Sequence, residues 1–367
     1  MKTTVKREEL LDPLQKVIGA VERKQTLPIL GHVLLQSNNG KTALTATDLE
    51  IELTARLNQI DGGDDFATTL PARKLLDIVK ALPEQSDITL ISEDGKIRIT
   101  AGRSRFTLGS LQAGDFPRVD DINPTSTFKL PQRVLKKLID KTAFAMALQD
   151  VRYYLNGMLV ELGTSGIRLV ATDGHRLALS EEPADLGIQT DRQLIIPRKG
   201  VLELGRLLTQ DDSETEVQIS QNHIRVLTDD LVFTSKLIDG KFPDYNRVIP
   251  EDGNQLMTVD RDVLKQALYR TSILSNEKYR GINLTISENT LGIKAHNPDQ
   301  EEAEEEISVD YNGNPMEIGF NVTYLLDVLA VLDSDQVHVK LLDPNSSCII
   351  TASDNDNFRY IVMPMRI

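Results

Sequence analysis

The sequence predicts an α+β fold built from three tandem copies of one unit, in which two helices pack on antiparallel sheets. Segments with helical periodicity recur at a spacing of roughly 125 residues. They alternate with segments in which apolar and polar residues take turns, as in half-buried strands. Because the copies fill all 367 residues, we expect three domains, at 1–125, 126–250 and 251–367, called here the first, second and third repeats.

Two helices are expected in each repeat, because apolar residues recur there every three or four positions. The first helix of each repeat is expected over 7–21, 131–146 and 261–274, and the second over 71–83, 197–208 and 321–333. A helix with one apolar face needs a sheet to cover, which places the unit in the α+β class.

Strands are expected on both sides of the second helix, where Ile, Val, Leu and Thr alternate with polar residues. They precede that helix over 44–53 and 169–179, with a third copy preceding it over 291–303, and they follow it over 88–108, 217–237 and 337–363. Within the first of these later segments, Asp94-Gly95 predicts a tight hairpin turn.

The composition excludes several classes of protein. The single cysteine, Cys348, rules out an internal disulfide framework and a cysteine-based zinc site. No apolar run approaches the roughly 20 residues that span a bilayer, and the first residues lack the apolar core of a signal peptide. We therefore expect a cytoplasmic protein without membrane contact, and the lack of a phosphate-binding loop or metal signature predicts no cofactor.

Charge is unevenly distributed along the chain. The formal net charge is −14, and the third repeat alone carries nine basic and 20 acidic residues, a charge of −11. Such a balance argues against a protein that binds nucleic acid simply by being basic. Basic side chains nevertheless gather on the expected helices: Arg73, Lys74, Lys80, Arg133, Lys136, Lys137, Lys141, Arg261, Lys265 and Arg270. Two interpretations stay open here, ordinary solvated helix faces or a surface that faces a polyanion.

A family resemblance rests on motifs that run in order along the whole chain. They are TLPIL, PARK, GRSRF, QDVRYYLNGML, ATDGHRLA, PRKG, FTSKLIDGKFPDY, ILSNEKYRG, EEAEEE, GFNVTYLLDVL and the terminal VMPMR. With these motifs the chain resembles the bacterial sliding clamps, the beta subunits of DNA polymerase III holoenzyme. The resemblance extends from residue 1 to residue 367.

The resemblance implies a non-catalytic processivity factor for DNA replication. Two chains would associate head to tail into a closed ring of six domains, with helices inside and sheets outside. Double-stranded DNA would pass through the ring and be held by topology, so that modest, sequence-independent phosphate contacts suffice. The positions that the family points to for DNA contact are Lys24, Arg73, Gln149, Tyr153, Tyr154 and Lys199. For Tyr153 and Tyr154, packing at a domain junction is an equally open interpretation.

The acidic run over 299–306 admits three interpretations: a metal site, a solvated charged edge, or part of a subunit interface. The resemblance favours the third and implies that glutamates of one chain face basic residues of the other, while an apolar patch supplies affinity. The implied interface residues are Glu301, Glu302 and Glu305 against Lys74, Arg103 and Arg105, and Phe106 and Leu108 against Ile273 and Leu274.

The stretch over 170–179 contains Asp173, His175 and Arg176, which suggests a catalytic pair beside an anion-binding arginine. The corresponding stretch of the first repeat, 44–53, keeps the Thr-Asp dipeptide but not the residues that follow it. We therefore interpret Thr172-Asp173 as a turn in which the aspartate bonds backbone N–H groups. A hydrolase using Asp173 and His175 is the rival hypothesis, and a protein-binding repeat scaffold that never contacts DNA is a second rival.

In the family this stretch forms one wall of a groove that binds peptide segments of partners. Those partners would be the polymerase III catalytic subunit, the clamp loader, translesion polymerases and repair proteins. Leu177, Val248, Val362 and Met363 are expected to supply apolar pockets, and Arg176, Arg247 and Arg366 to hold carbonyls or a carboxylate. The full set of implied groove residues is Leu155, Thr172, Gly174, His175, Arg176, Leu177, Pro243, Arg247, Val248, Ser347, Ile361, Val362, Met363, Pro364, Met365 and Arg366.

Overall fold

The computed structural model describes residues 2–22, 27–58, 60–61, 65–119, 122–250, 255–353 and 355–366. The chain folds into two compact units. Unit 1 comprises Met1–Leu135 and Lys199–Leu237, and unit 2 comprises Lys136–Arg198 and Ile238–Ile367. The second repeat is therefore shared between the units, and the reason lies in how its strands pair.

The smaller sheet of unit 1 belongs to the first repeat. Its strands run in the order β5-β1-β7-β8-β9, all antiparallel. Their bounds are β1 Lys2–Lys6, β5 Ile60–Asp61, β7 Asp87–Glu93, β8 Lys96–Ala101 and β9 Ser104–Gly109. Asp94 (φ 49°) and Gly95 (φ 73°) both adopt positive φ between β7 and β8, which confirms the predicted hairpin turn.

The larger sheet of unit 1 joins the first and second repeats. Its order is β10-β15-β16-β17-β4-β3-β2-β6. The strands are β2 His32–Asn38, β3 Lys41–Thr47, β4 Ile51–Leu57, β6 Phe66–Pro71, β10 Ser126–Pro131, β15 Glu214–Ile219, β16 His223–Leu227 and β17 Leu231–Lys236. The junction is the antiparallel pair β4 and β17, where Leu53 lies opposite Phe233.

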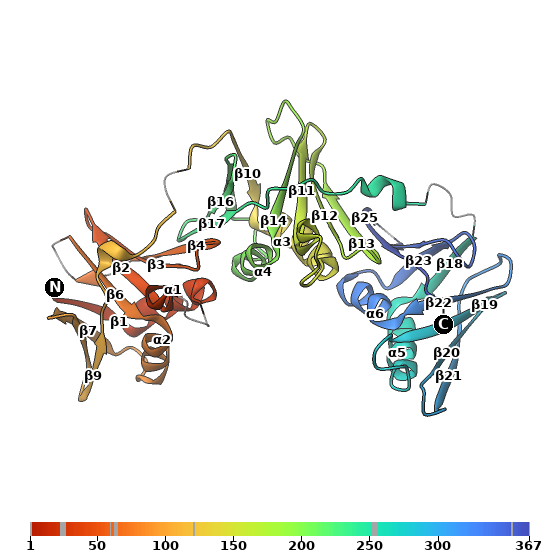
Figure 1. Cartoon of the computed structure of the whole chain (residues 1–367), viewed down its shortest axis with the longest axis horizontal. Coiled ribbons are helices and arrows are strands. Elements are labelled where there is room, and N and C mark those ends of the chain that lie inside the picture. The colour runs from red at the N-terminus through yellow and green to blue at the C-terminus, as the bar shows by residue number, and fades with distance from the viewer. Residues whose placement is uncertain are drawn as a thin grey trace. The chain divides into compact units, whose positions relative to one another are not determined.

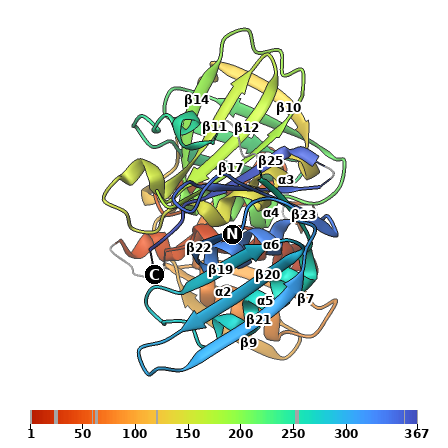
Figure 2. The same ribbon diagram turned by 90° about the vertical axis from the view of Figure 1, so that its right-hand side faces the viewer.

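Unit 2 repeats this arrangement with the second and third repeats (Figure 2). Its larger sheet has the order β14-β11-β12-β13-β25-β24-β23-β18, and its smaller sheet the order β21-β20-β19-β22. The strands are β11 Gly157–Gly163, β12 Gly166–Thr172, β13 Arg176–Glu182, β14 Arg192–Pro197, β18 Gln255–Asp260, β19 Gly281–Ser287, β20 Thr290–His296, β21 Glu302–Ser308, β22 Met316–Asn321, β23 Gln336–Leu341, β24 Cys348–Ala352 and β25 Asn355–Val362. Here β13 and β25 form the junction, with Ala178 opposite Tyr360.

In the part of the chain that the structure describes, six α-helices form, and all of them fall within the predicted segments. They are α1 Arg7–Val17, α2 Ala72–Ala81, α3 Gln132–Thr142, α4 Arg198–Leu207, α5 Arg261–Ser272 and α6 Val322–Val331. Short 3₁₀ turns occupy Ile18–Ala20, Pro28–Gly31, Ala113–Asp115, Ala143–Ala145, Tyr153–Asn156 and Tyr245–Val248. Helix α5 begins where the Asp260 side chain accepts a hydrogen bond from Val263 N (2.9 Å), as an N-cap does.

The helices cover the sheets with their apolar faces. In α2 the buried residues are Ala72, Leu75, Leu76 and Val79, at the spacing of one helix face. Within unit 1, α1 packs beside α2 and against β4, and within unit 2, α5 packs against β20 and β21 (Figure 1). Two helices and antiparallel strands thus recur in each repeat, which confirms the predicted α+β class.

Candidate functional site

The 172–176 turn joins β12 to β13 in unit 2 and is held by its own side chains. Thr172 Oγ1 donates to Arg176 O (2.6 Å) and accepts from Gly174 N (3.1 Å). Asp173 Oδ1 accepts hydrogen bonds from the backbone N–H groups of His175 (2.9 Å) and Arg176 (3.0 Å). Both polar side chains therefore satisfy the backbone of a tight turn.

The equivalent turn of the first repeat has the same construction. Thr47 Oγ1 donates to Ile51 O (2.8 Å), and Asp48 Oδ1 accepts from the N–H groups of Glu50 (3.0 Å) and Ile51 (2.8 Å). The prediction that Thr-Asp is a turn device is confirmed by these contacts. Because both oxygens of Asp173 are occupied, the second by Arg176 Nε (3.1 Å), the carboxylate has a structural role.

Arg176 lies at the centre of a dense set of contacts. Nη1 bonds Asp327 Oδ2 on α6 (2.6 Å), Nη2 donates to Phe144 O (2.8 Å), and the guanidinium carbon lies 4.4 Å from the Tyr324 ring centroid. Burial alone would lower the pKa of Arg176, but Tyr360 and the carboxylates of Asp327 and Asp173 raise it above its usual value. Sequence reasoning expected this guanidinium to hold a ligand, whereas its donors bind the protein itself.

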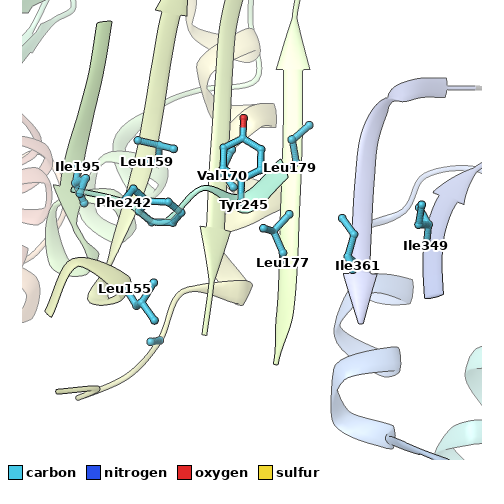
Figure 3. Packing of buried hydrophobic residues seen from close by; sticks show 11 residues of the cluster. Leu155, Leu159, Val170, Leu177, Leu179, Ile195, Phe242, Tyr245, Ile349 and Ile361 are labelled. Atoms are coloured by element: carbon cyan, nitrogen blue, oxygen red, sulfur yellow. The ribbon is translucent and has the colours of Figure 1, made fainter. Parts of the chain in front are cut away.

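A groove of about 190 Å³ opens beside this turn. Its lining consists of Arg152, Leu155, Thr172, Gly174, Arg176, Leu177, Pro243, Asp244, Tyr245, Val248, Ile361 and Met363. Leu177 on β13 and Ile361 on β25 form adjacent parts of the floor, because they are paired across the junction (Figure 3). The apolar floor therefore spans the strand pair that joins the second and third repeats.

Nine of the sixteen residues expected in the groove line it: Leu155, Thr172, Gly174, Arg176, Leu177, Pro243, Val248, Ile361 and Met363. The remaining seven are not among its lining residues: His175, Arg247, Ser347, Val362, Pro364, Met365 and Arg366. Val362 was expected to supply an apolar pocket, but side chains alternate along β25, so Val362 is buried on the opposite face from Ile361. Arg247 is 83% exposed and pairs with Asp244.

Three lining residues were missed by sequence reasoning: Arg152, Asp244 and Tyr245. Arg152 pairs with Asp150 (2.9 Å) and donates to Asp173 O (3.3 Å), so it lies at the end of the groove next to the turn. Hydrogen bonds from Arg152 hold the pKa of Asp150 at about 2, below its usual value. The QDVRYYLNGML motif contains Arg152, but nothing in the local sequence indicates that its side chain reaches the 172–176 turn.

A hydrophobic cluster adjoins the groove and shares Leu155, Leu177, Tyr245 and Ile361 with its lining (Figure 3). Its members are Ala147, Leu155, Leu159, Val170, Leu177, Leu179, Ile195, Phe242, Tyr245, Ile349 and Ile361. Tyr245 also donates its hydroxyl to Glu161 Oε2 (2.5 Å) and accepts from Arg168 (3.1 Å). Burial and the Glu161 carboxylate raise the pKa of Tyr245 to about 12. The segment around Tyr245, which forms one wall of the groove, is thus held both by apolar packing and by hydrogen bonds.

The residues expected to contact DNA have different surroundings. Arg73 on α2 and Gln149 are exposed, and Tyr153 is 56% exposed, whereas Tyr154 packs partly against the hydrophobic cluster. Lys199 forms an ion pair with Asp48 in unit 1. Lys24 lies outside the described residues.

One basic residue of α3 departs from its expected solvated face. Lys141 is only 8% exposed, and its ammonium group bonds Asp333 Oδ2 (2.7 Å) and the carbonyl of Val331 at the end of α6. Tertiary packing against α6 therefore overrides the helical periodicity that placed this lysine among solvated residues.

The residues expected at a subunit interface lie on or near two sheet edges. On β9, Arg105 is exposed and Phe106 and Leu108 are half-buried. Arg103, which immediately precedes β9, and Lys74 on α2 are also exposed. In unit 2, Glu301 and Glu302 are exposed, Ile273 is 66% exposed, Leu274 is half-buried, and Glu305 bonds Arg270 Nε (3.0 Å). Among the described residues, no group of His, Cys, Asp or Glu side chains is arranged to hold a metal ion.

Comparison with known protein families accounts for the whole repeat architecture. Three family models of the DNA polymerase III beta subunit match in order: the N-terminal domain over 1–120, the central domain over 129–244 and the C-terminal domain over 246–366. The chain belongs to the DNA polymerase III beta subunit family. Its fold is accordingly the three-domain clamp fold, with two helices and antiparallel sheet in each domain.

Relatives of this beta subunit family match over their full lengths. The chain is 53% identical to a beta sliding clamp of Pseudomonas aeruginosa and 50% identical to one of Escherichia coli, over 100% of each chain. The crystal structure of the Pseudomonas aeruginosa subunit superimposes with a TM-score of 0.96 over 100% of both chains, at 53% identity. The Caulobacter crescentus subunit gives 0.93 at 38% identity, again over 100% of both chains.

Family membership decides between the classes of function that the sequence left open. The chain is a DNA sliding clamp of the replication machinery, a processivity factor and not an enzyme. The hydrolase hypothesis for Asp173 and His175 is therefore abandoned. One solved relative from Pseudomonas aeruginosa has griselimycin bound. Among the described residues, no helix is long and apolar enough to cross a membrane.

Proposed function

We propose that two copies of the chain associate head to tail into a closed ring around double-stranded DNA, which the ring holds without reading its sequence. The observation that carries this proposal is an internal one. Each unit contains one junction between repeats, β4 with β17 in unit 1 and β13 with β25 in unit 2. In the described part of each unit, the strands equivalent to these, β9 and β21, end their sheets with one edge open.

The equivalence can be followed residue by residue. Phe106, Phe233 and Tyr360 occupy the same register, opposite Ile99, Val226 and Ile350 of the preceding strands. On the other side, Leu53, Ala178 and Ala303 lie opposite Ala46, Ala171 and Ala295. Since Leu53 faces Phe233 and Ala178 faces Tyr360, the same register places Ala303 opposite Phe106 of a second copy. Phe233 and Tyr360 are fully buried, and half-buried Phe106 would become so.

This register also pairs charges across the proposed interface. One position along from Phe106 and Ala303, in opposite directions, the same register sets exposed Arg105 against exposed Glu304, with Glu302 diagonal to it and within reach of a long side chain. The apolar patch of Phe106, Leu108, Ile273 and Leu274 would supply affinity, while Glu301, Glu302 and Glu305 would set orientation against Lys74, Arg103 and Arg105.

We further assign the three domains to 1–125, 126–250 and 251–367 and the DNA contacts to Lys24, Arg73, Gln149, Tyr153, Tyr154 and Lys199. Contacts from a few cations and polar groups suit a protein of net charge −14, because ring closure and not affinity would retain the DNA. A cytoplasmic location follows from this role in replication.

The groove is proposed to bind short peptide segments of the polymerase III catalytic subunit, the clamp loader, translesion polymerases and repair proteins. Its apolar floor, with an adaptable methionine at Met363, suits ligands that share a few apolar anchors. Arg176 is buried and engaged, whereas Arg152 pairs with Asp150 but keeps 47% of its side chain exposed. Arg152 is therefore the more accessible of the two lining arginines for a ligand carbonyl or carboxylate, and Asp244 is the complementary anion.

Retention on circular DNA tests the proposed function. The protein is loaded on a nicked circle with a compatible clamp loader and ATP, and retention is measured before and after the circle is cut. Topological linkage predicts that the protein stays on the circle and leaves the linear form. Equal retention on both forms would show binding through contacts alone and would contradict the ring.

A peptide-binding assay tests the groove separately. A short synthetic peptide with a glutamine and a Leu-Phe end is expected to bind the wild type but not the Met363→Asp variant, because a carboxylate would enter an apolar floor. The dimer should persist in that variant. Loss of the dimer together with peptide binding would contradict the placement of Met363 in the groove.

A further inference from the structure

Arg176 connects three parts of unit 2 that are far apart in sequence. Its guanidinium bonds Asp173 in the 172–176 turn, the Phe144 carbonyl after α3, and Asp327 on α6. We propose that Arg176 and Asp327 are positioning residues for the groove: their ion pair fixes the 172–176 turn against α6 and so sets the separation of the groove walls. This inference rests on the proposed binding of peptides in the groove.

The turn itself does not require an arginine at this position. In the first repeat the equivalent residue is Ile51, and the Thr47-Asp48 turn forms there with the same hydrogen bonds. The contacts of Arg176 to α6 are therefore additional to those that build the turn. They are also well sheltered, since the Arg176 side chain is 10% exposed and the Asp327 side chain 35% exposed.

Two features hold the Arg176 guanidinium on α6. Asp327 accepts from Nη1 at 2.6 Å, and the ring of Tyr324, one turn earlier in the helix, lies 4.4 Å from the guanidinium carbon. Tyr324 O in turn accepts the hydroxyl of buried Tyr360 on β25 (3.0 Å). A planar guanidinium between a carboxylate and an aromatic ring is restricted in both direction and tilt.

Backbone pairing connects Arg176 and its neighbour His175 to both walls of the groove. Arg176 pairs with Val362 across the junction of β13 and β25, and His175 O accepts from Met363 N (2.9 Å). Gly174 lines the groove from the turn, and Met363 lines it from the chain that follows β25. A displacement of Arg176 would therefore move two lining residues together, although Asp327 does not line the groove.

A second ion pair, formed just beyond the end of the same helix, provides a matched control. Lys141 bonds Asp333 and the Val331 carbonyl, and neither Lys141 nor Asp333 lines the groove. Removing Asp333 therefore weakens the attachment of the end of α6 without acting on the 172–176 turn. Comparison of Asp327→Ala with Asp333→Ala separates groove positioning from general docking of the helix.

The experiment measures peptide affinity and local exchange in the full-length protein. The synthetic peptide with a glutamine and a Leu-Phe end is titrated against the wild type, Asp327→Ala, Asp327→Glu and Asp333→Ala, and amide hydrogen exchange is recorded at Met363. Asp327→Ala should weaken binding about tenfold, equivalent to about 1.4 kcal/mol, and accelerate exchange of the Met363 amide. Asp327→Glu should recover most of both effects, and Asp333→Ala should change neither.

The possible outcomes separate this inference from the proposed function. If the wild type does not bind the peptide, the proposed function of the groove fails. If the wild type binds and Asp327→Ala binds equally well or more tightly, the ion pair does not position the groove and the inference is overturned. An equal loss in Asp333→Ala would also overturn it, because the effect would then arise from docking of α6 as a whole.

Discussion

The guanidinium of Arg152 lies 2.9 Å, measured from Nη2, from the point where a Cβ on Gly174 would stand. Gly174 also has φ +89°, a conformation that L side chains rarely adopt. Gly174→Ala should therefore cost about 1 kcal/mol from the backbone and should push Arg152 away from the end of the groove. Thermal unfolding and titration with the Leu-Phe peptide measure the two effects.

A glycine elsewhere in unit 2 isolates the contribution of Arg152. Gly187 has φ +66°, and a Cβ there would meet nothing within 4 Å. Gly187→Ala should share the backbone cost but leave peptide affinity unchanged. Equal peptide affinities in the two variants would show that Arg152 contributes nothing to binding.

The hydroxyl of Tyr245 makes the stability of unit 2 depend on pH in the alkaline range. Burial and Glu161 raise the pKa of this hydroxyl to about 12, from about 10 in an unfolded chain. Between these values the unfolded chain loses a proton that the folded chain keeps, so the free energy of unfolding falls as pH rises. Tyr245→Phe should lose about 1 kcal/mol at neutral pH, and its deficit relative to the wild type should shrink between about pH 10 and 12. A deficit that does not change with pH would contradict this assignment, and denaturant unfolding at each pH measures it.

Glu52 distinguishes the first repeat from the second. It occupies the same register position as Leu177 and is only 7% exposed. Its carboxylate accepts a hydrogen bond from Val119 N (2.8 Å). In unit 1 this position therefore binds the segment that follows the sheet, whereas in unit 2 it forms part of the groove floor. Burial raises the pKa of Glu52, with Val119, Arg118 and Arg225 opposing the shift.

A raised carboxyl pKa has a defined effect on stability. From the unfolded pKa near 4.5 upward, the unfolded chain ionises before the folded chain does, so this group's contribution to stability declines as pH rises through its folded pKa. Glu52→Gln keeps an acceptor for Val119 N without the charge. The free energy of unfolding of the variant, taken relative to that of the wild type, should therefore be higher at pH 7 than at pH 4, as measured by denaturant unfolding. The opposite order would mean that Arg118 and Arg225 outweigh burial.

Local patterns predicted the elements well, and tertiary contacts account for what they missed. The Asp94-Gly95 turn and the Thr172-Asp173 turn depend on neighbouring residues only, and both were predicted from a few letters of sequence. The burial of Lys141 depends on α6, which lies 190 residues away in the sequence.

The groove shows the same division between local and distant contacts. Its apolar residues follow from the family motifs, but the roles of its arginines do not. Arg176 was expected to bind ligand because nothing near it in sequence reveals Asp327, 151 residues distant. Arg152 was overlooked because its approach to Gly174 is decided by the fold of the 150–156 segment, where Asp150 N bonds Asn156 Oδ1 (2.9 Å). Pairings between distant segments are the part of a site that a single sequence leaves open.

Charge reversal at Arg105 and Glu304 tests the register proposed for the subunit interface. Arg105→Glu places a glutamate among Glu302, Glu304 and Glu306 of the partner strand, where like charges directly opposite are destabilising. The dimer dissociation constant, measured by analytical ultracentrifugation, should rise about tenfold at low salt and less at high salt. Glu304→Arg alone should act in the same direction, since it faces Arg105.

The double variant decides whether these two residues are direct partners. With both charges exchanged, each new glutamate meets a new arginine, and the dissociation constant should return most of the way to that of the wild type. A matched double variant, Arg105→Glu with Glu317→Arg on β22, changes the same charges but leaves the proposed pair unmatched. If that variant recovers as well, the effect is one of net charge, and the strands meet in a register other than the one repeated at β4 with β17 and at β13 with β25.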